Sequence, residues 1–243
     1  MNFPPGSTRT VIQPRYAVIA PDSRVSSVIP GWSGCAAQVQ ISAAMGAGLV
    51  QLLVDVPRAG AAAGATGEDE MLLYIVSGAC SLNGRKLSAG HFAFLPPGTD
   101  FALRGAAKAT QLVIFQKRYE PLAGQTAPGA VFGDAAKIKS APFLGDPNAR
   151  LQMLLPDTPA FDMAVNIFTY DPGATLPFVE SHIMEHGMLF LGGAGIYRLG
   201  GDWHPVQAGD AIWIAPYCEQ WFVAMGKTPA RYIYYKDVNR PPR

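Results

Sequence analysis

The sequence predicts an all-β fold made of two tandem β units. Its 243 residues include 26 glycines and 21 prolines, which are frequent in turns. Short apolar runs lie between these turn residues, as in residues 49–54 and 211–215, and short runs of this kind are typical of strands. No long stretch has the 3.6-residue apolar period of a helix, so we expect any helix to be short.

An internal repeat separates the expected strands into two sets. Residues 74–79 match residues 189–194 at an offset of 115 positions, and residues 88–97 match residues 207–216 at an offset of 119 positions. The second copy therefore has a hairpin that is four residues longer. Such duplication indicates two equivalent structural units in tandem.

The connection between the two copies is rich in Gly, Pro and Ala, from about Leu122 to Pro147. Domain boundaries fall in segments of this composition. We therefore expect residues 1–130 to form the N-terminal unit and residues 131–243 the C-terminal unit.

Composition and charge exclude several classes of function. The net charge is +1, with Lys and Arg scattered along the chain, so neither nucleic acid nor an anionic membrane is expected as a partner. The N-terminus lacks the pattern of a secretory signal, and no apolar stretch approaches the roughly 20 residues that span a bilayer. Cys35, Cys80 and Cys218 are widely spaced and form no CxxC motif. We expect free thiols and a cytoplasmic location.

Three candidate metal ligands lie within one short segment, residues 180–186. His182 and His186 follow Glu180 at even spacings, so alternation along a strand would place all three side chains on one face. A carboxylate oxygen and two imidazole nitrogens suit a first-row divalent cation, and a nearby amide can complete the set. The segment therefore predicts a metal site.

The spacing resembles the two motifs of the cupin family. The first motif carries three ligands between glycines, and it matches Gly173, Glu180, His182, His186 and Gly193. The second motif carries a glycine, a proline and a last ligand, and it matches Gly209, Pro216 and Gln220. The resemblance implies a bicupin, two small double-sheet barrels with the jelly-roll arrangement, with a metal inside the barrel.

The repeat offsets indicate which barrel can bind a metal. The positions of the first copy that correspond to the four ligands are Ala65, Gly67, Met71 and Phe101. None of these side chains is a good ligand for a hard cation. We therefore expect a structural N-terminal barrel without a metal and a C-terminal barrel that carries the chemistry.

The ligand set departs from the common cupin pattern of three His and one Glu. Glu-x-His-x-x-x-His with a downstream Gln resembles the (S)-ureidoglycine aminohydrolase family, and the resemblance spans most of the chain, including residues 8–17 and 29–32. It implies a homo-oligomer that hydrolyses the small ureide (S)-ureidoglycine to (S)-ureidoglycolate and ammonia in purine and allantoin breakdown. It also implies that Mn(II) is the cofactor and that its ligands are Glu180, His182, His186 and Gln220.

The same resemblance implies that the substrate contacts are Tyr197, Tyr232, Lys236, Glu180 and Gln220. Alternation along one strand places Tyr232, Tyr234 and Lys236 on one face and Tyr235 on the other. An inward lysine needs an anion, so Lys236 is expected to hold a substrate carboxylate or ureido oxygen. Glu180 is the candidate for proton transfer, and Glu180 and Lys236 are the predicted catalytic residues. The tyrosines could instead pack the barrel core.

Three charged residues outside the ligand set are expected at the surface. Glu185 precedes a ligand and should point away from the metal, and Asp69 and Glu70 fall in the first copy of the repeat.

Two other classes of function stay open, because fold does not fix function. One is another metal-dependent cupin enzyme, such as an iron dioxygenase or an isomerase, whose usual ligand set contains more histidines. The other is a bicupin that binds a ligand without catalysis, which the inward Tyr and Lys set disfavours. Measuring ammonia release from freshly generated ureidoglycine, with and without manganese, distinguishes the three.

Overall fold

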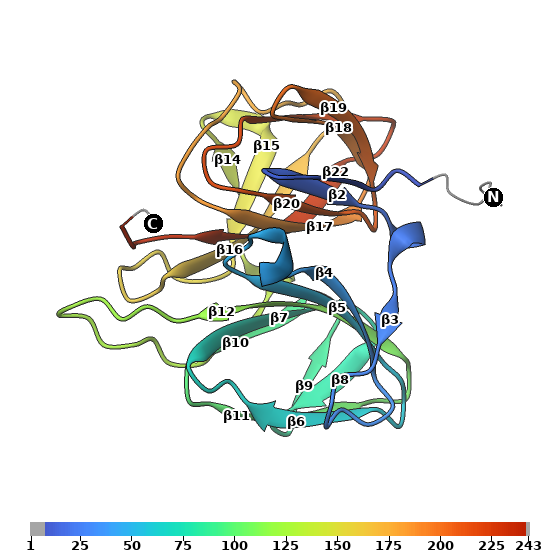
Figure 1. Cartoon of the computed structure of the whole chain (residues 1–243), viewed down its shortest axis with the longest axis vertical. Helices are drawn as coiled ribbons and strands as arrows, with labels where there is room; N and C mark the ends of the chain where they lie inside the picture. Colours follow the sequence, from blue (N-terminus) through green and yellow to red (C-terminus); the bar gives the residue numbers. More distant parts are fainter. Residues whose placement is uncertain (1–7, 242–243) are drawn as a thin grey trace.

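The computed structural model describes residues 8–241, and these form two stacked β units (Figure 1). The described residues contain 22 strands and three short 3-10 helices, η1 (Pro21–Ser23), η2 (Ala43–Met45) and η3 (Ala135–Lys137). Each unit pairs a large sheet with a small one, as expected of a double-sheet barrel. The predicted all-β fold with tandem barrels is confirmed.

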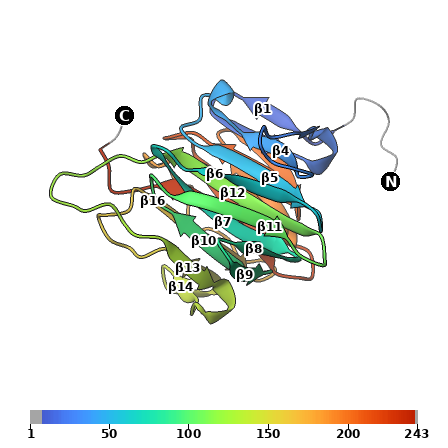
Figure 2. The ribbon, with the colours of Figure 1, turned by 90° about the horizontal axis from the view of Figure 1, so that it is seen from below.

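The N-terminal unit consists of a seven-stranded and a four-stranded sheet. The large sheet holds, in spatial order, β13 (Val131–Asp134), β10 (His91–Leu95), β7 (Asp69–Ser77), β12 (Thr110–Arg118), β5 (Val50–Val56), β4 (Ala36–Ile41) and β3 (Ser26–Ser27). The small sheet holds β6 (Ala61–Ala65), β11 (Asp100–Gly105), β8 (Ala79–Leu82) and β9 (Arg85–Ser88). Figure 2 shows β4, β5, β12, β7 and β10 running side by side.

The C-terminal unit consists of an eight-stranded and a three-stranded sheet. The large sheet holds, in spatial order, β1 (Val11–Gln13), β2 (Tyr16–Ile19), β20 (Ala211–Ile214), β17 (His186–Gly192), β22 (Ala230–Asp237), β16 (Met163–Tyr170), β15 (Asp146–Met153) and β14 (Ala141–Phe143). The small sheet holds β19 (Asp202–Gln207), β18 (Ala194–Leu199) and β21 (Gln220–Met225).

Two glycines show the repeat in three dimensions. Gly78 lies between β7 and β8, and Gly193 lies between β17 and β18, each with a positive φ, 79° and 69° respectively. A Cβ atom at Gly78 would lie 2.1 Å from the carbonyl oxygen of Ala109, and one at Gly193 would lie 2.3 Å from that of Pro229. Only glycine fits such a close approach at positive φ, so the same turn is required in both units.

The two units exchange strands. β2 pairs with β20 of the C-terminal unit, with Tyr16 opposite Ile214, although β2 comes at the start of the chain. β13 pairs in return with β10 of the N-terminal unit, with Phe92 opposite Gly133. β2 therefore belongs to the sheet of the C-terminal unit although it lies within residues 1–130, and β13 belongs to the sheet of the N-terminal unit although it lies within residues 131–243. The division of the chain at residues 130 and 131 stays a proposal.

The large sheets of the two units face each other at the centre of the molecule (Figure 1). One core cluster contains buried side chains from both sheets, among them Leu53 and Phe115 of the N-terminal unit and Trp213 and Ile233 of the C-terminal unit. The rings of Phe115 and Tyr235 stack with centroids 6.4 Å apart. Two further clusters fill the interiors of the separate units. The units are therefore joined by an apolar core of their own.

Glu70 is buried, and its expected place at the surface is wrong. It is fully buried (0 % exposed) on β7, and the Nζ atom of Lys117 lies 3.9 Å from its carboxylate. Lys117 also forms an ion pair with the buried Asp162. Burial and the nearby Asp162 carboxylate raise the pKa of Glu70 to about 9. The surface expectation fails because β7 is a central strand with one face toward the other unit, so a charged residue there is enclosed.

Candidate active site

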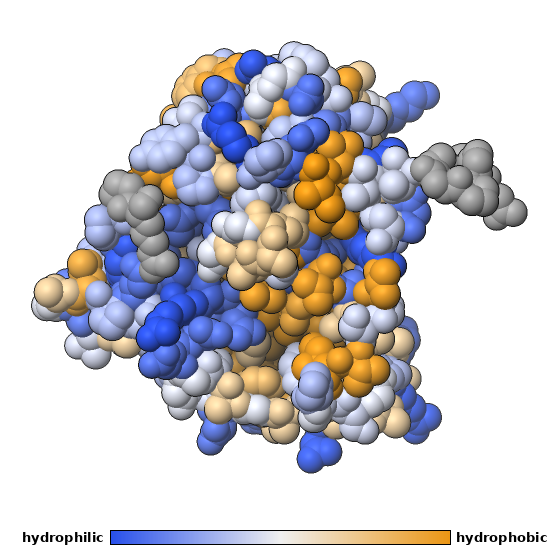
Figure 3. Space-filling model, viewed as in Figure 1, coloured by the Kyte–Doolittle hydropathy of each residue, from blue (hydrophilic) through white to orange (hydrophobic). Residues whose placement is uncertain are grey.

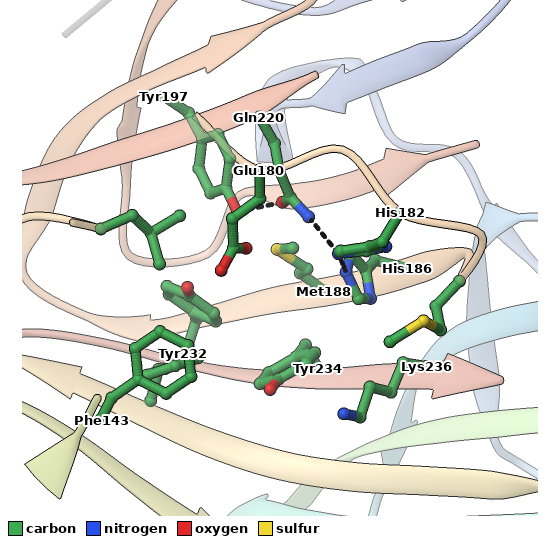
Figure 4. Close-up of a pocket in the computed structure, with 13 residues that line it drawn as sticks. Phe143, Glu180, His182, His186, Met188, Tyr197, Gln220, Tyr232, Tyr234 and Lys236 are labelled. Carbon is green, nitrogen blue, oxygen red and sulfur yellow. Dashed lines mark hydrogen bonds between the residues drawn. The ribbon is translucent and has the colours of Figure 1, made fainter. Parts of the chain in front are cut away.

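The predicted site residues line one cavity of about 180 Å³ inside the C-terminal unit (Figure 4). Its wall includes Glu180, His182, His186, Tyr197, Gln220, Tyr232 and Lys236. These side chains come from the segment before β17 and from β17, β18, β21 and β22, so both sheets of the barrel contribute. The structure thus brings all seven side chains together in one cavity.

The segment that carries the candidate ligands is not one strand, and that expectation is wrong. Glu180 forms an isolated bridge with Gln220, with N···O distances of 2.8 and 2.9 Å in the two directions, and β17 begins only at His186. Between them, the Tyr217 amide donates to the His182 carbonyl oxygen at 2.7 Å. The segment is held at separate anchors rather than by a continuous ladder, yet its side chains at residues 180, 182 and 186 all face the cavity.

The hydrogen bonds of the two histidines direct their lone pairs into the cavity. His186 Nδ1 lies 3.2 Å from the carbonyl oxygen of Tyr235, which only accepts, so Nδ1 carries the proton and Nε2 is left as an acceptor. Gln220 Nε2 lies 3.0 Å from His182 Nε2, and the Nε2 atoms of the two histidines are 3.2 Å apart. The two ring nitrogens therefore lie where one cation could bind both and replace the contact between them.

Burial keeps both imidazoles neutral, which a metal ligand requires. Burial, with help from the neighbouring His182, lowers the pKa of His186 to about 3. Burial likewise lowers the pKa of His182. Burial raises the pKa of Glu180, and the Lys236 ammonium opposes that shift.

The donor set fits a first-row divalent cation, although the carboxylate is turned away. In the part of the chain that the structure describes, no three His, Cys, Asp or Glu side chains lie close enough together to hold a metal ion. Figure 4 shows the Glu180 carboxylate pointing toward Tyr197 and Tyr232 rather than toward the histidines. Two neutral imidazoles, a carboxylate and an amide are nevertheless the nitrogen and oxygen donors that such cations bind.

Tyr197 contacts the candidate ligand Gln220. Its hydroxyl donates to Gln220 Oε1 at 2.8 Å, and the ring is buried among the aromatic side chains of the barrel. Burial raises the pKa of Tyr197 well above its usual value, so the hydroxyl keeps its proton. The structure therefore places Tyr197 where it orients the amide of Gln220 as well as lining the cavity.

The opposite wall of the cavity is formed by β22. Tyr232, Tyr234 and Lys236 face the cavity, and Tyr235 lies in the core between the units, in the alternation expected of a strand. No Asp or Glu oxygen of the described residues lies within 4.0 Å of the Lys236 ammonium. A half-buried ammonium that faces a cavity in this way favours an anionic ligand.

Sequence reasoning missed Asn166, which supports this wall. Its Nδ2 atom donates to the Tyr234 hydroxyl at 3.2 Å from the neighbouring strand β16, and both side chains are buried. The available signal was a single amide inside the apolar run 163–168, because a buried amide needs a partner.

Glu185 points away from the cavity as expected, but its expected place at the surface is wrong. It is 6 % exposed, and the indole Nε1 of Trp213 donates to its Oε1 atom at 2.6 Å. The Gly48 amide of the N-terminal unit donates to both carboxylate oxygens at 3.1 Å. Burial raises the pKa of Glu185 to about 7, and the two donors oppose that shift. The contact with the other unit, which no local pattern shows, is what encloses it.

The corresponding end of the N-terminal barrel is mostly apolar, with Thr66 and Gln116 as the polar side chains of its lining. Ala65, Met71 and Phe101 line a cavity of about 290 Å³ together with Trp32. The rings of Trp32 and Phe101 meet edge to face, with centroids 6.1 Å apart. That this barrel binds no metal stays a prediction from its side chains.

Comparison with known proteins identifies the family. Residues 166–235, which hold much of the cavity wall, match the cupin domain family. The chain is 38% identical over 245 residues to the (S)-ureidoglycine aminohydrolase of Arabidopsis thaliana, covering 98% of this chain and 80% of that protein. The chain belongs to the (S)-ureidoglycine aminohydrolase family. It is also 34% identical to the Escherichia coli K12 member, covering 93% of this chain and 89% of that protein.

A solved structure extends this likeness to the whole fold. The putative glyoxylate-induced protein of Pseudomonas aeruginosa superposes with a TM-score of 0.89 at 29% identity, covering 100% of this chain and 95% of that one. The resemblance to cupins and to the aminohydrolase family, first seen in the motifs, is therefore confirmed. None of the helices within residues 8–241 has the length and apolar character needed to cross a membrane.

Proposed function

We propose that the protein hydrolyses (S)-ureidoglycine to (S)-ureidoglycolate and ammonia, with Mn(II) as its cofactor, in the breakdown of purine-derived ureides. The observation that carries the proposal is the convergence of Glu180, His182, His186 and Gln220 on one small cavity whose opposite wall holds Lys236. Membership of the aminohydrolase family supports the substrate and the reaction.

The substrate is a small amino acid whose α-carbon also bears a ureido nitrogen. Lys236 is placed to bind its carboxylate or ureido oxygen by a charge-assisted hydrogen bond. The hydroxyls of Tyr232 and Tyr234, which face the same cavity, can donate to the remaining oxygens. Burial raises the pKa of Tyr234 and of Tyr232, so both act as donors. Together these groups orient the reacting carbon.

Hydrolysis replaces the amine on that carbon by a hydroxyl. The carbon–nitrogen bond breaks with its electron pair on nitrogen, which takes up a proton and leaves as ammonia. A water oxygen forms the new bond to the same carbon and gives up a proton. Glu180 faces the cavity and can accept the proton from water and transfer it to the leaving amine. Atoms and charge then balance without an external acid or base.

Glu180, His182, His186 and Gln220 would hold the Mn(II) ion. When bound, it supplies Lewis-acid stabilisation of the charge that develops on the substrate. Tyr197 would keep the Gln220 amide in place, since its hydroxyl can serve as donor or acceptor to either end of the amide. The catalytic residues of the proposal are Glu180 and Lys236.

We further propose a cytoplasmic homo-oligomer. The three cysteines are free and buried, which suits a reducing compartment. Figure 3 shows apolar side chains gathered on one face near β3, where Val25 and Val28 are 76 % and 79 % exposed. Exposed apolar surface of this kind is typical of association sites.

The test is ammonia release from freshly generated ureidoglycine. Protein stripped by a chelator and reloaded with Mn(II) should release ammonia much faster than the substrate decays on its own, and the stripped protein should not. His182→Ala protein treated in the same way is the control for adventitious manganese. Ammonia release by the fully loaded protein at the spontaneous rate would overturn the assignment and leave another cupin enzyme, or a non-catalytic binding protein, as the alternative.

A further inference from the structure

The N-terminal unit holds the backbone just before His186. Gly48 lies between η2 and β5 of that unit, and its amide donates to both carboxylate oxygens of Glu185, each at 3.1 Å. Trp213 on β20 donates to the same carboxylate at 2.6 Å. A Cβ atom at Gly48 would lie 3.2 Å from Glu185 Oε2, so the approach is close. One buried carboxylate thus connects the N-terminal unit, β20 and the start of β17.

The N-terminal unit also holds the backbone just after His186. The fully buried Gln51 on β5 donates through Nε2 to the carbonyl oxygen of Met188 at 2.8 Å, and to Gln40 Oε1 at 2.7 Å. At Gly187, a Cβ atom would lie 2.7 Å from both Gln51 Oε1 and Leu49 Cδ1. A side chain at residue 187 would therefore displace the side chains of Gln51 and Leu49.

His186 therefore lies between two contacts that the other unit supplies. Residues 181–185 belong to no strand. The ladders of β17 begin at His186, opposite Ile214 of β20 and Lys236 of β22, so they do not hold the residues before it. The Glu185 amide donates to Asp237 on β22, which joins the same point to the strand that carries Lys236. The direction in which His186 Nε2 points depends on this backbone, because the polar contacts of the ring itself are with the Tyr235 carbonyl oxygen through Nδ1 and with His182 Nε2 through Nε2.

We propose that Glu185 and Gln51 are positioning residues for His186, and that through them the N-terminal barrel sets the geometry of the metal site. This inference rests on the proposed role of His186 as a metal ligand. Removing a residue that orients a metal-bound histidine commonly changes the metal affinity, although that residue does not contact the metal. The N-terminal barrel then contributes to the active site by positioning a metal ligand, in addition to any role in stability.

The experiment compares Glu185→Ala with Glu185→Gln in the full-length protein. The glutamine keeps an acceptor oxygen for Trp213 and Gly48, whereas alanine removes both contacts. The Mn(II) dissociation constant is measured from the free Mn(II) signal in electron paramagnetic resonance. We expect Glu185→Ala to weaken binding by about 10- to 100-fold and Glu185→Gln to restore most of the affinity. Gln51→Leu, which keeps the volume but not the donor, should weaken binding in the same direction.

A second measurement is independent of metal. In the metal-free protein, the nitrogen chemical shifts of the His186 ring should show one tautomer, with the proton on Nδ1. In Glu185→Ala they should shift toward a mixture of tautomers, and in Glu185→Gln they should not. Thermal unfolding is recorded in parallel, and Trp213→Phe replaces Glu185→Ala if the latter does not fold.

The outcomes separate this inference from the proposed function. A lower melting temperature for Glu185→Ala, with unchanged Mn(II) affinity and unchanged ring shifts, would reduce Glu185 to a purely structural role and overturn the inference. Wild-type protein that binds no Mn(II) would overturn the proposed function instead. In that event the ring shifts still decide whether Glu185 positions His186.

Discussion

Replacing Lys236 by methionine should leave the fold and the metal affinity intact while most turnover is lost. Lys236 lies on β22, its side chain faces the cavity, and no described carboxylate oxygen is within 4.0 Å of its ammonium. Methionine has a similar length and an apolar end, so the variant removes the charge without opening a large void. The four candidate ligands are unchanged.

The expected decrease in kcat/KM follows from the loss of the hydrogen bond between Lys236 and the substrate. A hydrogen bond to a charged group contributes about 1.5–3 kcal/mol. If the contact persists in the transition state, the loss appears in kcat/KM as roughly a 10- to 100-fold decrease. Because Lys236 is only half-buried, we expect the lower half of this range.

The assay measures kcat and KM for ammonia release by protein fully loaded with Mn(II). Lys137→Met is the matched control, since the Lys137 side chain is 84 % exposed and its nearest paired carboxylate, Asp134, is 3.9 Å away. The control should keep kcat/KM within about twofold. If Lys236→Met keeps it as well, Lys236 does not hold the substrate anion, and the reasoning from its position in the cavity is wrong.

Three further predictions concern the metal, a turn and a buried carboxyl. His182→Ala should abolish Mn(II) binding, whereas Gln220→Ala should weaken it less because a neutral amide is the poorest ligand of the four. Calorimetric titration measures Mn(II) binding by both variants, and equal losses of affinity would contradict this ranking. Gly193→Ala should lower the free energy of unfolding by about 2 kcal/mol or more, because its Cβ would meet the Pro229 carbonyl at positive φ. Gly192→Ala is the control: a Cβ there meets nothing within 4 Å, so the free energy of unfolding should change by less than about 1 kcal/mol. Denaturant titration measures both variants. The pKa of Glu70 is raised to about 9 in the folded state. The folded state therefore keeps a proton on Glu70 that the unfolded state releases near pH 4.5. As a result, the contribution of Glu70 to the free energy of unfolding falls as pH rises from about 4.5 to about 9. Glu70→Gln should flatten that part of the pH dependence of the melting temperature, and an unchanged slope would show that Glu70 is ionised in the fold.

The cavity wall was predictable because strand alternation is a local property. Tyr232, Tyr234 and Lys236 face the cavity while Tyr235 faces the other unit, and their spacing alone determines this. The repeat was also visible, because Gly78 and Gly193 meet the same steric requirement in both units. Local sequence patterns carry this kind of information directly.

Contacts between distant segments were not predictable in this way. The pairing of β2 with β20 joins Tyr16 to Ile214, and no local pattern contains the partner. Glu70 and Glu185 were expected at the surface because charged residues mostly lie there. Each is enclosed by the packing of one large sheet on the other, which depends on the whole fold.

The direct test of the account is a crystal structure of the Mn(II)-loaded protein with anomalous data collected at the manganese edge. We predict one anomalous peak per chain, within the C-terminal barrel, with Glu180, His182, His186 and Gln220 around it. The Glu180 carboxylate should then be turned toward the two histidines. A peak in the N-terminal barrel among Ala65, Met71 and Phe101, or a fully loaded protein whose manganese lies outside the C-terminal cavity, would contradict the assignment of the active site.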